Sequence, residues 1–495
     1  MIVEAFYEIF CDMKIKTHSV KYNFIMNFIL TATQFIFPLI TFPYVSRVLQ
    51  AAGNGRVSFA ASAAHYFMMV ASLGIPTYGI RACARVRDDK DKLSKTVHEL
   101  FIINFITTCL VTVTYIGCIL VVPRFANDKA LFFINGINVV LNMFGMNWVY
   151  QALEQYDYIT FRSITFKVIS IILMFALVHT QDDYIIYGAI TVFAAVGSYV
   201  LNFIRLRRII SFKLFKDYNL KQHLKPIVTL FAQSLAVSIY TNLDTVMLGF
   251  MKTDVDVGYY NAAVKIKGIL LSLVASLGNV LLPRMAYYVK NQMMPEFKKY
   301  MLKALNFELL MSFALVVYFV LFSKELILFI AGSGYNGAVL AMQIITIAII
   351  PNGLTGILGV QVLTSLEKEK YVLYSVIVGA VVDFILNLVF IPNYGATGAA
   401  LATTIAEFLV LAVQFVYTRA LLQEVRKGFR WYYYLPISIA SGFAAYLVKS
   451  IELSNSLTIV VSAFVFLILY CMGLLLVKET IAINVLGGLK KKISK

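Results

Sequence analysis

Charged residues are scarce in this sequence of 495 amino acids. Asp, Glu, Lys and Arg together make up 14% of it, whereas they make up about a quarter of an ordinary soluble domain. Apolar residues make up 60%, and the mean hydropathy is +0.79. A chain with so little charge cannot cover a globule that faces water, so the composition excludes a soluble protein.

Cysteine is rare as well. No two of the five cysteines form a CxxC pair, and most of them lie in or beside apolar runs. We therefore expect reduced structural thiols, with neither a disulfide framework nor a metal site. The cysteines are Cys11, Cys83, Cys109, Cys118 and Cys471.

The common motifs of catalytic and nucleotide-binding sites are also missing. The sequence has no P-loop, no HExxH, no GxSxG and no acidic cluster on a loop of useful length. The glycine-rich stretch 395–400 is better explained as the close-packed start of a helix than as a phosphate-binding loop. We therefore expect a transporter rather than an enzyme, without a cofactor and without direct use of ATP.

Long apolar runs are what the sequence has in abundance. Each run of 18 or more mostly apolar residues is long enough to cross the roughly 30 Å hydrocarbon layer as a helix. The runs are too long for barrel strands, so we expect an all-α polytopic membrane protein of about fourteen helices. The predicted spans are 23–46, 57–81, 97–122, 130–153, 159–179, 184–204, 226–251, 257–282, 303–323, 336–363, 371–391, 397–418, 433–449 and 456–477.

Lysine and arginine predict the orientation of these spans. The net charge of +17 would also suit a nucleic-acid-binding protein, but 34 of the 43 basic residues fall on one side when the loops alternate. Positive loops face the cytoplasm, so the basic excess indicates topology and excludes nucleic acid as a partner. Arg162 and Lys167 are counted on this cytoplasmic side. Both termini are then cytoplasmic, and residues 1–22 lack the pattern of a cleaved signal.

An internal repeat divides the spans into two halves. Val-Ala-Ser-Leu-Gly occurs at 70–74 and again at 274–278, at equal places in two sets of six spans. Both copies begin inside, which predicts parallel repeats with a substrate path between them. The expected segments are an interfacial segment (1–22), an N-lobe (23–204), a cytoplasmic linker (205–225), a C-lobe (226–418), two further helices (433–477) and a basic cytoplasmic tail (478–495).

Polar residues follow one face of the first, second and eighth spans at spacings of three and four. Small and hydroxyl residues also serve ordinary helix packing in lipid. Three such faces on equivalent hairpins nevertheless favour a polar central cavity. Its candidate lining residues are Asn27, Gln34, His65, Asn261 and Lys265.

Ionisable residues deep in a span should face a cavity or a partner, because a charge at mid-bilayer costs at least a few kcal/mol. Asp244 and Lys265 are each about nine residues from the turn between spans seven and eight, so they can pair. The pair either only permits insertion, or releases Lys265 to hold an anionic headgroup. Lys267 points about 200° away from Lys265 around the helix and is expected to contact another helix.

Asp383 and Glu407 lie at similar depth on either side of one turn, and neither helix places a lysine or arginine close to them. Two carboxylates that face one pocket raise each other's proton affinity or attract a cation. We hypothesise that they couple transport to H⁺ or Na⁺, with Asp244 as a third candidate. The alternative is two separate residues that hydrogen-bond to neighbouring helices.

Several stretches resemble the polysaccharide-transport branch of the MOP superfamily, which includes the Wzx-type flippases of O-antigen and capsule units and their teichoic-acid relatives. One departure concerns the first external turn, where Gln50 and Ala51 stand in place of the glycine that is more usual in the family. The similar stretches are 43–49 (PYVSRVL), Gly53 with Gly55, 73–81 (LGIPTYGIR), 147–154 (NWVYQALE), Asp244 to Gly249, 257–266 (VGYYNAAVKI) and 394–400 (YGATGAA).

The resemblance implies two six-helix lobes that open alternately to each face of a bacterial inner membrane. A cationic cavity would receive the phosphate of a polyprenyl-linked glycan, with Arg47 at the outer mouth and Lys265 inside. Arg81 and Arg284 would gather phosphates on the cytoplasmic side, or serve only as topology anchors. Membrane lipids, a polysaccharide polymerase and glycosyltransferases are the implied partners.

Two other functions remain open at this stage. A MATE-like antiporter of cationic drugs would need an apolar or acidic pocket, whereas Lys265 favours an anion. A membrane glycosyltransferase or polymerase would need longer external loops than the short ones predicted here, and acidic clusters on them.

Overall fold

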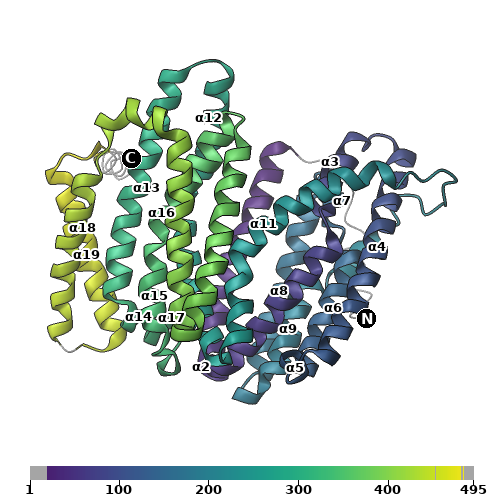
Figure 1. Cartoon of the computed structure of the whole chain (residues 1–495), viewed down its shortest axis with the longest axis horizontal. Coiled ribbons are helices and arrows are strands. Elements are labelled where there is room, and N and C mark those ends of the chain that lie inside the picture. Colours follow the sequence, from purple (N-terminus) through teal and green to yellow (C-terminus); the bar gives the residue numbers. More distant parts are fainter. Residues whose placement is uncertain (1–18, 452, 481–482, 484–495) are drawn as a thin grey trace, which may run out of the picture. The chain divides into compact units, whose positions relative to one another are not determined.

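The structure is a computed structural model that describes residues 19–451, 453–480 and 483. Every regular element in these residues is a helix (Figure 1), which confirms the all-α fold class. The predicted interfacial segment 1–22 and the predicted tail 478–495 lie almost entirely outside the described residues. By contact, the chain forms two compact units, Met1–Gly258 (unit 1) and Tyr259–Lys495 (unit 2).

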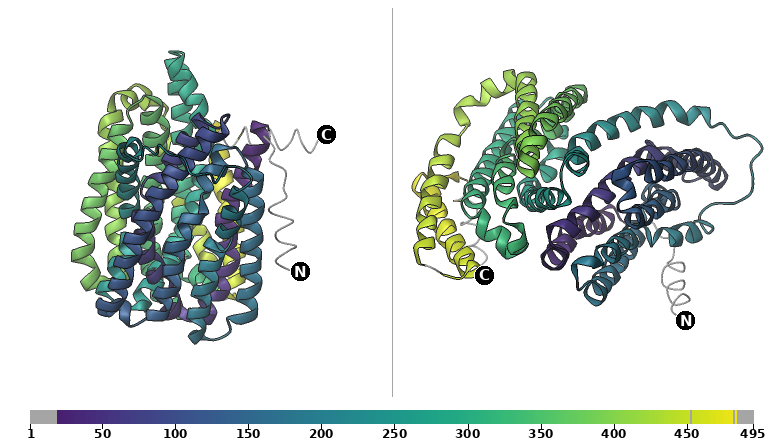
Figure 2. Two further views of the ribbon diagram at one scale, coloured as in Figure 1. Left: turned by 90° about the vertical axis from the view of Figure 1, so that its right-hand side faces the viewer. Right: turned by 60° about the horizontal axis from the view of Figure 1, so that its bottom comes forward.

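Unit 1 contains ten helices of the described residues and the start of α12. An irregular segment between α10 and α11, drawn in teal in Figure 2, corresponds to the predicted linker 205–225. Helix α11 packs against α2 and α3, so this helix belongs by contact to unit 1, although the repeat assigned it to the second half. The helices are α2 (Val20–Ser72), α3 (Ile75–Arg85), α4 (Lys90–Val121), α5 (Pro123–Ala126), α6 (Lys129–Gly145), α7 (Asn147–Ala152), α8 (Tyr156–Leu177), α9 (Tyr184–Val196), α10 (Tyr199–Leu206) and α11 (Lys221–Met251).

Unit 2 holds the rest of α12 and the helices that follow it. A π-helical segment at Gly356–Leu363 continues from α16. The helices are α12 (Asp254–Lys290), α13 (Met294–Leu321), α14 (Ser323–Ile330), α15 (Ala338–Ile347), α16 (Ile349–Thr355), α17 (Glu369–Val425), α18 (Trp431–Tyr446) and α19 (Asn455–Leu476).

Ten helical stretches of the described residues are long and apolar enough to cross a membrane. Two of them, which contain α2 and α17, have 65 and 60 residues, about twice what one crossing needs. Helices α11 and α12 are long enough, with 31 and 37 residues, but they are less apolar because they carry residues such as Asp244 and Lys265. The multi-pass architecture is thus confirmed, and the count of fourteen spans stays a prediction.

Helix α2 is in fact two helices joined at Gln50, whose φ of 55° and ψ of −175° are not helical. Near its start, Asn23 donates to Glu154. At its end, Ser72 accepts a hydrogen bond from Asn142. Both ends therefore reach the same region of α6 to α8, and the reversal lies at the lower edge of Figure 1.

Helix α17 reverses in the same manner at Gly395, with φ 53° and ψ −130°. Its two arms run side by side, because Gln414 donates to Ser375 Oγ at 3.0 Å. The rings of Tyr371 and Tyr417 also stack with centroids 4.0 Å apart. The glycine-rich stretch 395–400 is therefore a tight helix entry, as the sequence predicted.

We expect the substitution Gln50→Gly to stabilise the protein by about 1 kcal/mol, because only glycine adopts this φ and ψ without a steric cost. The gain is partly offset, since Gln50 Nε2 donates to the Arg47 carbonyl at 2.6 Å. The matched variant Gln50→Ala loses that bond and keeps the strained backbone, so it should melt below the wild type. Melting temperatures in detergent that fail to rank glycine above alanine would contradict this explanation.

Two of the stretches that carry the family resemblance meet inside unit 1. Gly79 of α3 packs so closely on Trp148 of α7 that a Cβ at position 79 would come within 2.5 Å of the indole ring. A Cβ at Gly74 would likewise overlap the Ile227 carbonyl at the start of α11. These glycines let α3 lie against both helices, and Trp148 is buried in the resulting core.

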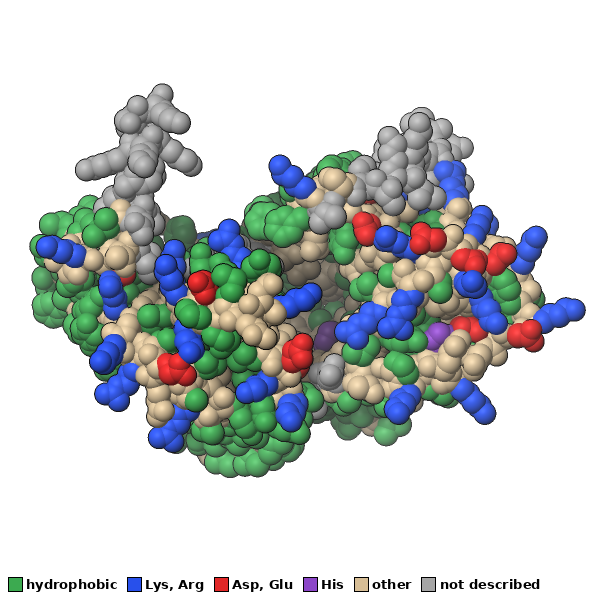
Figure 3. Space-filling view, turned by 90° about the horizontal axis from the view of Figure 1, so that it is seen from above, with side chains coloured by type: hydrophobic (Ala, Val, Ile, Leu, Met, Phe, Trp, Pro, Cys, Tyr) green, Lys and Arg blue, Asp and Glu red, His purple; other side chains and the backbone are tan. Residues whose placement is uncertain are grey.

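Lysines and arginines crowd the face shown in Figure 3, which looks down on the end of Figure 1 where α3 and α7 lie. The predicted orientation in the membrane stays a prediction. Counting Lys167 on the cytoplasmic side is wrong. Lys167 lies in the middle of α8, which begins at Tyr156 and ends at Leu177, about 16 Å along the helix axis. The predicted span 159–179 already contained it.

Candidate functional site

A polar cleft of about 570 Å³ opens in unit 1 between α2, α3, α6 and α11. His65 of α2 lines it, and Asn142 of α6 donates to Ser72 Oγ at 2.6 Å. From α11, Asn242 donates to Thr241 Oγ1 at 2.9 Å. Imidazole, amide and hydroxyl groups of this kind both donate and accept hydrogen bonds, so the cleft suits an uncharged polar group such as a sugar.

A second cavity of about 300 Å³ in unit 1 lies between α2, α8 and α9. Lys167 lines it together with Gln34 and Thr41. The Lys167 ammonium donates to Thr33 Oγ1 at 3.3 Å and lies 5.3 Å from the ring centroid of Phe37. Within the described residues Lys167 has no carboxylate partner, so this cavity suits an anionic group.

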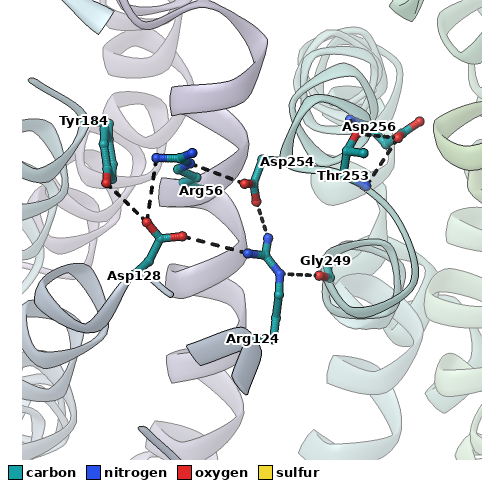
Figure 4. A network of polar contacts seen from close by, with 8 residues as sticks. All are labelled: Arg56, Arg124, Asp128, Tyr184, Gly249, Thr253, Asp254 and Asp256. Atoms are coloured by element: carbon teal, nitrogen blue, oxygen red, sulfur yellow. Dashed lines mark hydrogen bonds and ion pairs between the residues drawn. The ribbon is translucent and has the colours of Figure 1, made fainter. Parts of the chain in front are cut away.

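Four charged residues of unit 1 form a closed network, which we call the quartet: Arg56, Arg124, Asp128 and Asp254 (Figure 4). Asp254 bridges the two arginines, since Arg56 Nε lies 3.3 Å from its Oδ2 and Arg124 pairs with its Oδ1. Asp128 closes the ring at 3.9 Å from Arg56 Nη1 and 3.8 Å from Arg124 Nη1. Tyr184 also donates to Asp128 at 3.2 Å.

Backbone contacts reinforce the quartet. Arg124 Nε donates to the Gly249 carbonyl at 2.6 Å. A Cβ at Gly55 would overlap the carbonyl of Asp254, and a Cβ at Gly258 would overlap that of Ala51. Arg56 and Asp254 stand at the external turns of the two predicted repeats, so the quartet ties these turns together at the predicted outer surface.

In unit 2, the two carboxylates predicted to couple transport to an ion are both buried, Asp383 at 1% and Glu407 at 4% exposure. Glu407 Oε1 lies 4.0 Å from Lys267 Nζ, a contact between α17 and α12. Lys267 is therefore the interhelix contact that its helical position predicted. Asp383 accepts a hydrogen bond from Asn387 at 3.2 Å. The pairing of Glu407 with a lysine was not foreseen, because that lysine comes from a different helix.

The other predicted site residues are placed as follows. Lys265 and Asn261 are half-buried, one helical turn apart on α12. Asp244 is buried on α11. The pairing of Asp244 with Lys265 stays a prediction. Exposed residues are Asn27, Arg47, Arg81 and Arg284, and Arg47 donates to the Pro43 carbonyl at 3.1 Å.

One buried polar cluster was missed by the sequence analysis. Glu99 of α4 accepts from the backbone N–H of Asn219 at 2.7 Å and from Gln222 at 3.0 Å. It also contacts His223 Nε2 at 2.8 Å, whose Nδ1 contacts Tyr78 Oη at 2.9 Å. The cluster fastens the start of α11 to α3 and α4. Glu99 inside the predicted span 97–122 was the sequence feature that pointed to this cluster. Its partners could not be predicted, because they lie more than a hundred residues away along the chain.

No group of three or more His, Cys, Asp or Glu residues in the described part of the chain could hold a metal ion. The two cavities of unit 1 instead combine hydrogen-bonding groups with one lysine. The arrangement can bind a polar and anionic molecule within membrane-spanning helices.

The sequence is similar to known families of membrane proteins. The family model described as "Polysaccharide biosynthesis protein" matches residues 20–289, and the MatE family model matches residues 230–389. A "Putative O-antigen transporter" of Escherichia coli (strain K12) is 23% identical over 405 residues, which cover 81% of this chain and 97% of the relative. A Shigella dysenteriae protein of the same name is 23% identical over 402 residues, covering 79% and 98%.

Solved structures share the fold. A lipid II flippase, MurJ, in an inward closed conformation superimposes with a TM-score of 0.73 at 17% identity and covers 91% of this chain and 99% of its own. An inward-facing multidrug transporter of the MATE family, of the MOP superfamily, has a TM-score of 0.60 at 13% identity, covering 79% and 96%. At such identities the likeness concerns the fold.

Proposed function

Because the chain belongs to the polysaccharide biosynthesis protein family, we propose that it is a flippase for an oligosaccharide linked to a polyprenyl phosphate or pyrophosphate. It is a multi-pass membrane transporter of the MOP superfamily, as its sequence predicted. We place it in the bacterial inner membrane with both termini cytoplasmic. Glycosyltransferases would supply its substrate, and a polymerase would consume the product.

One observation carries the choice of an anionic glycan over a cationic drug. Within unit 1, the polar cleft offers hydroxyl, amide and imidazole groups, and the neighbouring cavity contains the ammonium of Lys167 without a carboxylate partner in the described residues. A half-buried cation such as Lys167 repels a cationic drug and attracts a phosphate. An O-antigen unit, another surface glycan and a teichoic-acid precursor all combine these chemical features.

Purified protein in vesicles tests the proposal. The probe is a fluorescent glycan on undecaprenyl pyrophosphate, and its transfer between leaflets is followed by a membrane-impermeant quencher. We expect the protein to accelerate this transfer and to leave labelled phosphatidylglycerol where it is. Equal movement of both lipids would indicate a scramblase, and export of a cationic dye without movement of the glycan would favour an antiporter.

Alternating access would require the outer surface to open, and we infer that the quartet holds it closed. Arg56 and Arg124 converge on Asp254, so separating the two external turns breaks both ion pairs at once. Because the quartet is half-buried rather than deeply buried, its ion pairs are worth a few kcal/mol at most. A free energy of this size is enough to favour the closed conformation, and substrate binding can supply enough to favour the open one.

We propose that Asp383 and Glu407 couple the transfer to H⁺ or Na⁺, with Asp244 contributing. Replacing both with their amides, Asp383→Asn and Glu407→Gln, should abolish any response of glycan transfer to an imposed pH or Na⁺ gradient, because amides carry no titratable charge. The matched control is Glu424→Gln on the same helix, whose carboxylate pairs with Lys298 at the surface. If glycan transfer by the double variant responds to the gradients as transfer by the wild type does, neither residue takes part in the coupling.

A further inference from the structure

Glu308 is a buried carboxylate that the proposed transport mechanism does not use. It stands in the middle of the 28-residue helix α13 and is only 2% exposed. Its one described hydrogen bond comes from Ser312 Oγ, one turn further along the same helix, at 2.6 Å. No lysine, arginine or histidine within the described residues pairs with it.

The surroundings of Glu308 are shaped around its carboxylate. Gly353 of α16 lies so close that a Cβ there would overlap the carboxylate. The carboxylate borders a cavity of about 240 Å³ between α12, α13, α16 and the π-helical segment. Among the described side chains that line this cavity, Glu308 is the only ionisable one.

Two amide side chains of the same cavity provide further oxygen atoms. Gln361 of the π-helical segment is 5% exposed, and its Oε1 has no hydrogen-bond partner among the residues that the structure describes. Asn352 of α16 directs its Nδ2 to the Ala348 carbonyl at 3.0 Å, which leaves Oδ1 to accept. π-Helical turns are rare and occur mostly at functional sites, and here the turn carries Gln361 into the cavity wall.

A carboxylate buried without a cation costs several kcal/mol, and an unpartnered buried acceptor adds to that cost. One ligand removes both costs, since a cation neutralises Glu308 and satisfies the oxygen of Gln361. Carboxylate, amide carbonyl and hydroxyl oxygens are the ligands of hard cations. We propose that Glu308, Gln361, Asn352 and Ser312 form a site for one monovalent cation, H⁺ or Na⁺, inside unit 2.

This site is distinct from the ion-coupling residues proposed above, because neither Asp383 nor Glu407 lines the cavity. Ionisable groups on α13 and on the helices near it have other contacts. Tyr470 of α19 donates to the Leu310 carbonyl, and Tyr318 of α13 contacts Ser462. Lys267 of α12 lies beside Glu407 of α17, Glu325 of α14 pairs with Lys449, and the ring of Tyr434 of α18 packs against that of Tyr433. Glu308 is thus the group through which a cation would act in this cavity.

Binding is tested on the full-length protein in detergent, without a transport assay. The melting temperature is measured in NaCl against choline chloride at constant ionic strength, and again from pH 5 to pH 9. A cation that binds the folded state stabilises it. A rise in Na⁺ would identify a sodium site, and a rise only at low pH would identify a proton site.

Glu308→Gln keeps the shape of the side chain and removes its charge, so the melting temperature of this variant should no longer depend on the cation that stabilises the wild type. The matched control Glu369→Gln, an exposed carboxylate at the start of α17, should leave it unchanged. If Glu308→Gln does not fold, Gln361→Leu serves instead and should raise the half-saturating Na⁺ or H⁺ concentration at least tenfold. A wild-type protein that responds to neither ion, or a Glu308→Gln variant that responds as the wild type does, would overturn the proposal. If the protein failed to transfer the glycan in vesicles, the proposed flippase function would be wrong, but the cation site would not be contradicted.

Discussion

The substitution Lys265→Gln should lower glycan transfer at least tenfold while leaving the amount of inserted protein unchanged. Lys265 is half-buried on α12, one turn from Asn261. A hydrogen bond between an ammonium and a phosphate is worth about 1.5–3 kcal/mol, and 1.4 kcal/mol corresponds to a factor of ten. The glutamine side chain is one atom shorter than that of lysine and keeps hydrogen-bond donors but has no charge, so a lower rate measures mainly the loss of the charge.

The control for this experiment is Lys290→Gln, which removes an exposed lysine at the end of the same helix. Its transfer rate should equal that of the wild type. The measurement is the initial rate of glycan transfer in vesicles that contain equal amounts of inserted protein. A lower rate then cannot result from poor insertion of the variant. Equal rates for Lys265→Gln and the wild type would exclude Lys265 from the substrate site.

Removing the central arginine of the quartet, with Arg124→Ala, should destabilise the closed outer surface by about 3 kcal/mol. The variant loses ion pairs to Asp254 and Asp128 and the hydrogen bond to Gly249. It also loses a cation–π contact in which the guanidinium carbon lies 4.7 Å from the ring centroid of Phe59. Breaking one partner of a buried pair costs about 3–5 kcal/mol, and this quartet is partly exposed, so we expect the lower end.

Accessibility provides a readout that simple destabilisation does not. A cysteine introduced at Ala51, which touches Gly258 in the closed form, should react faster with a membrane-impermeant maleimide when Arg124 is replaced. Lys129→Ala, an exposed cation on the next helix, is the matched control and should leave the labelling rate unchanged. If Arg124→Ala labels no faster than Lys129→Ala, the quartet does not close the outer surface.

Helix content and membrane insertion were predictable because they depend on local composition. A run of apolar residues prefers lipid wherever its neighbours are, and the basic loops report their side without any knowledge of packing. Helical periodicity also predicted correctly that Lys267 contacts another helix. These properties belong to single helices, so one sequence was enough to predict them.

Two errors in the sequence analysis had a local origin too. Lys167 was counted on the cytoplasmic side although the predicted span contained it, and α8 places it at mid-helix. Glu308 was not among the deep ionisable residues, because its predicted span began at 303 and left it near an end. Helix α13 begins at Met294 instead, so the same glutamate lies in the middle. The position of a helix end therefore decides whether a charged residue lies near that end or in the middle of the helix, and a sequence predicts helix ends poorly.

What the sequence by itself determined about this protein is that it crosses a membrane repeatedly as helices and that it resembles a family of glycan transporters. It also predicted which side carries the basic loops. Only the tertiary structure decided which charges meet. Arg56 and Asp254 are 198 residues apart, and Lys267 and Glu407 are 140 apart. Such pairs depend on how helices pack and where a chain reverses, as at Gln50 and Gly395. Hydropathy and periodicity describe one helix at a time, so they contain no information on which helices become neighbours.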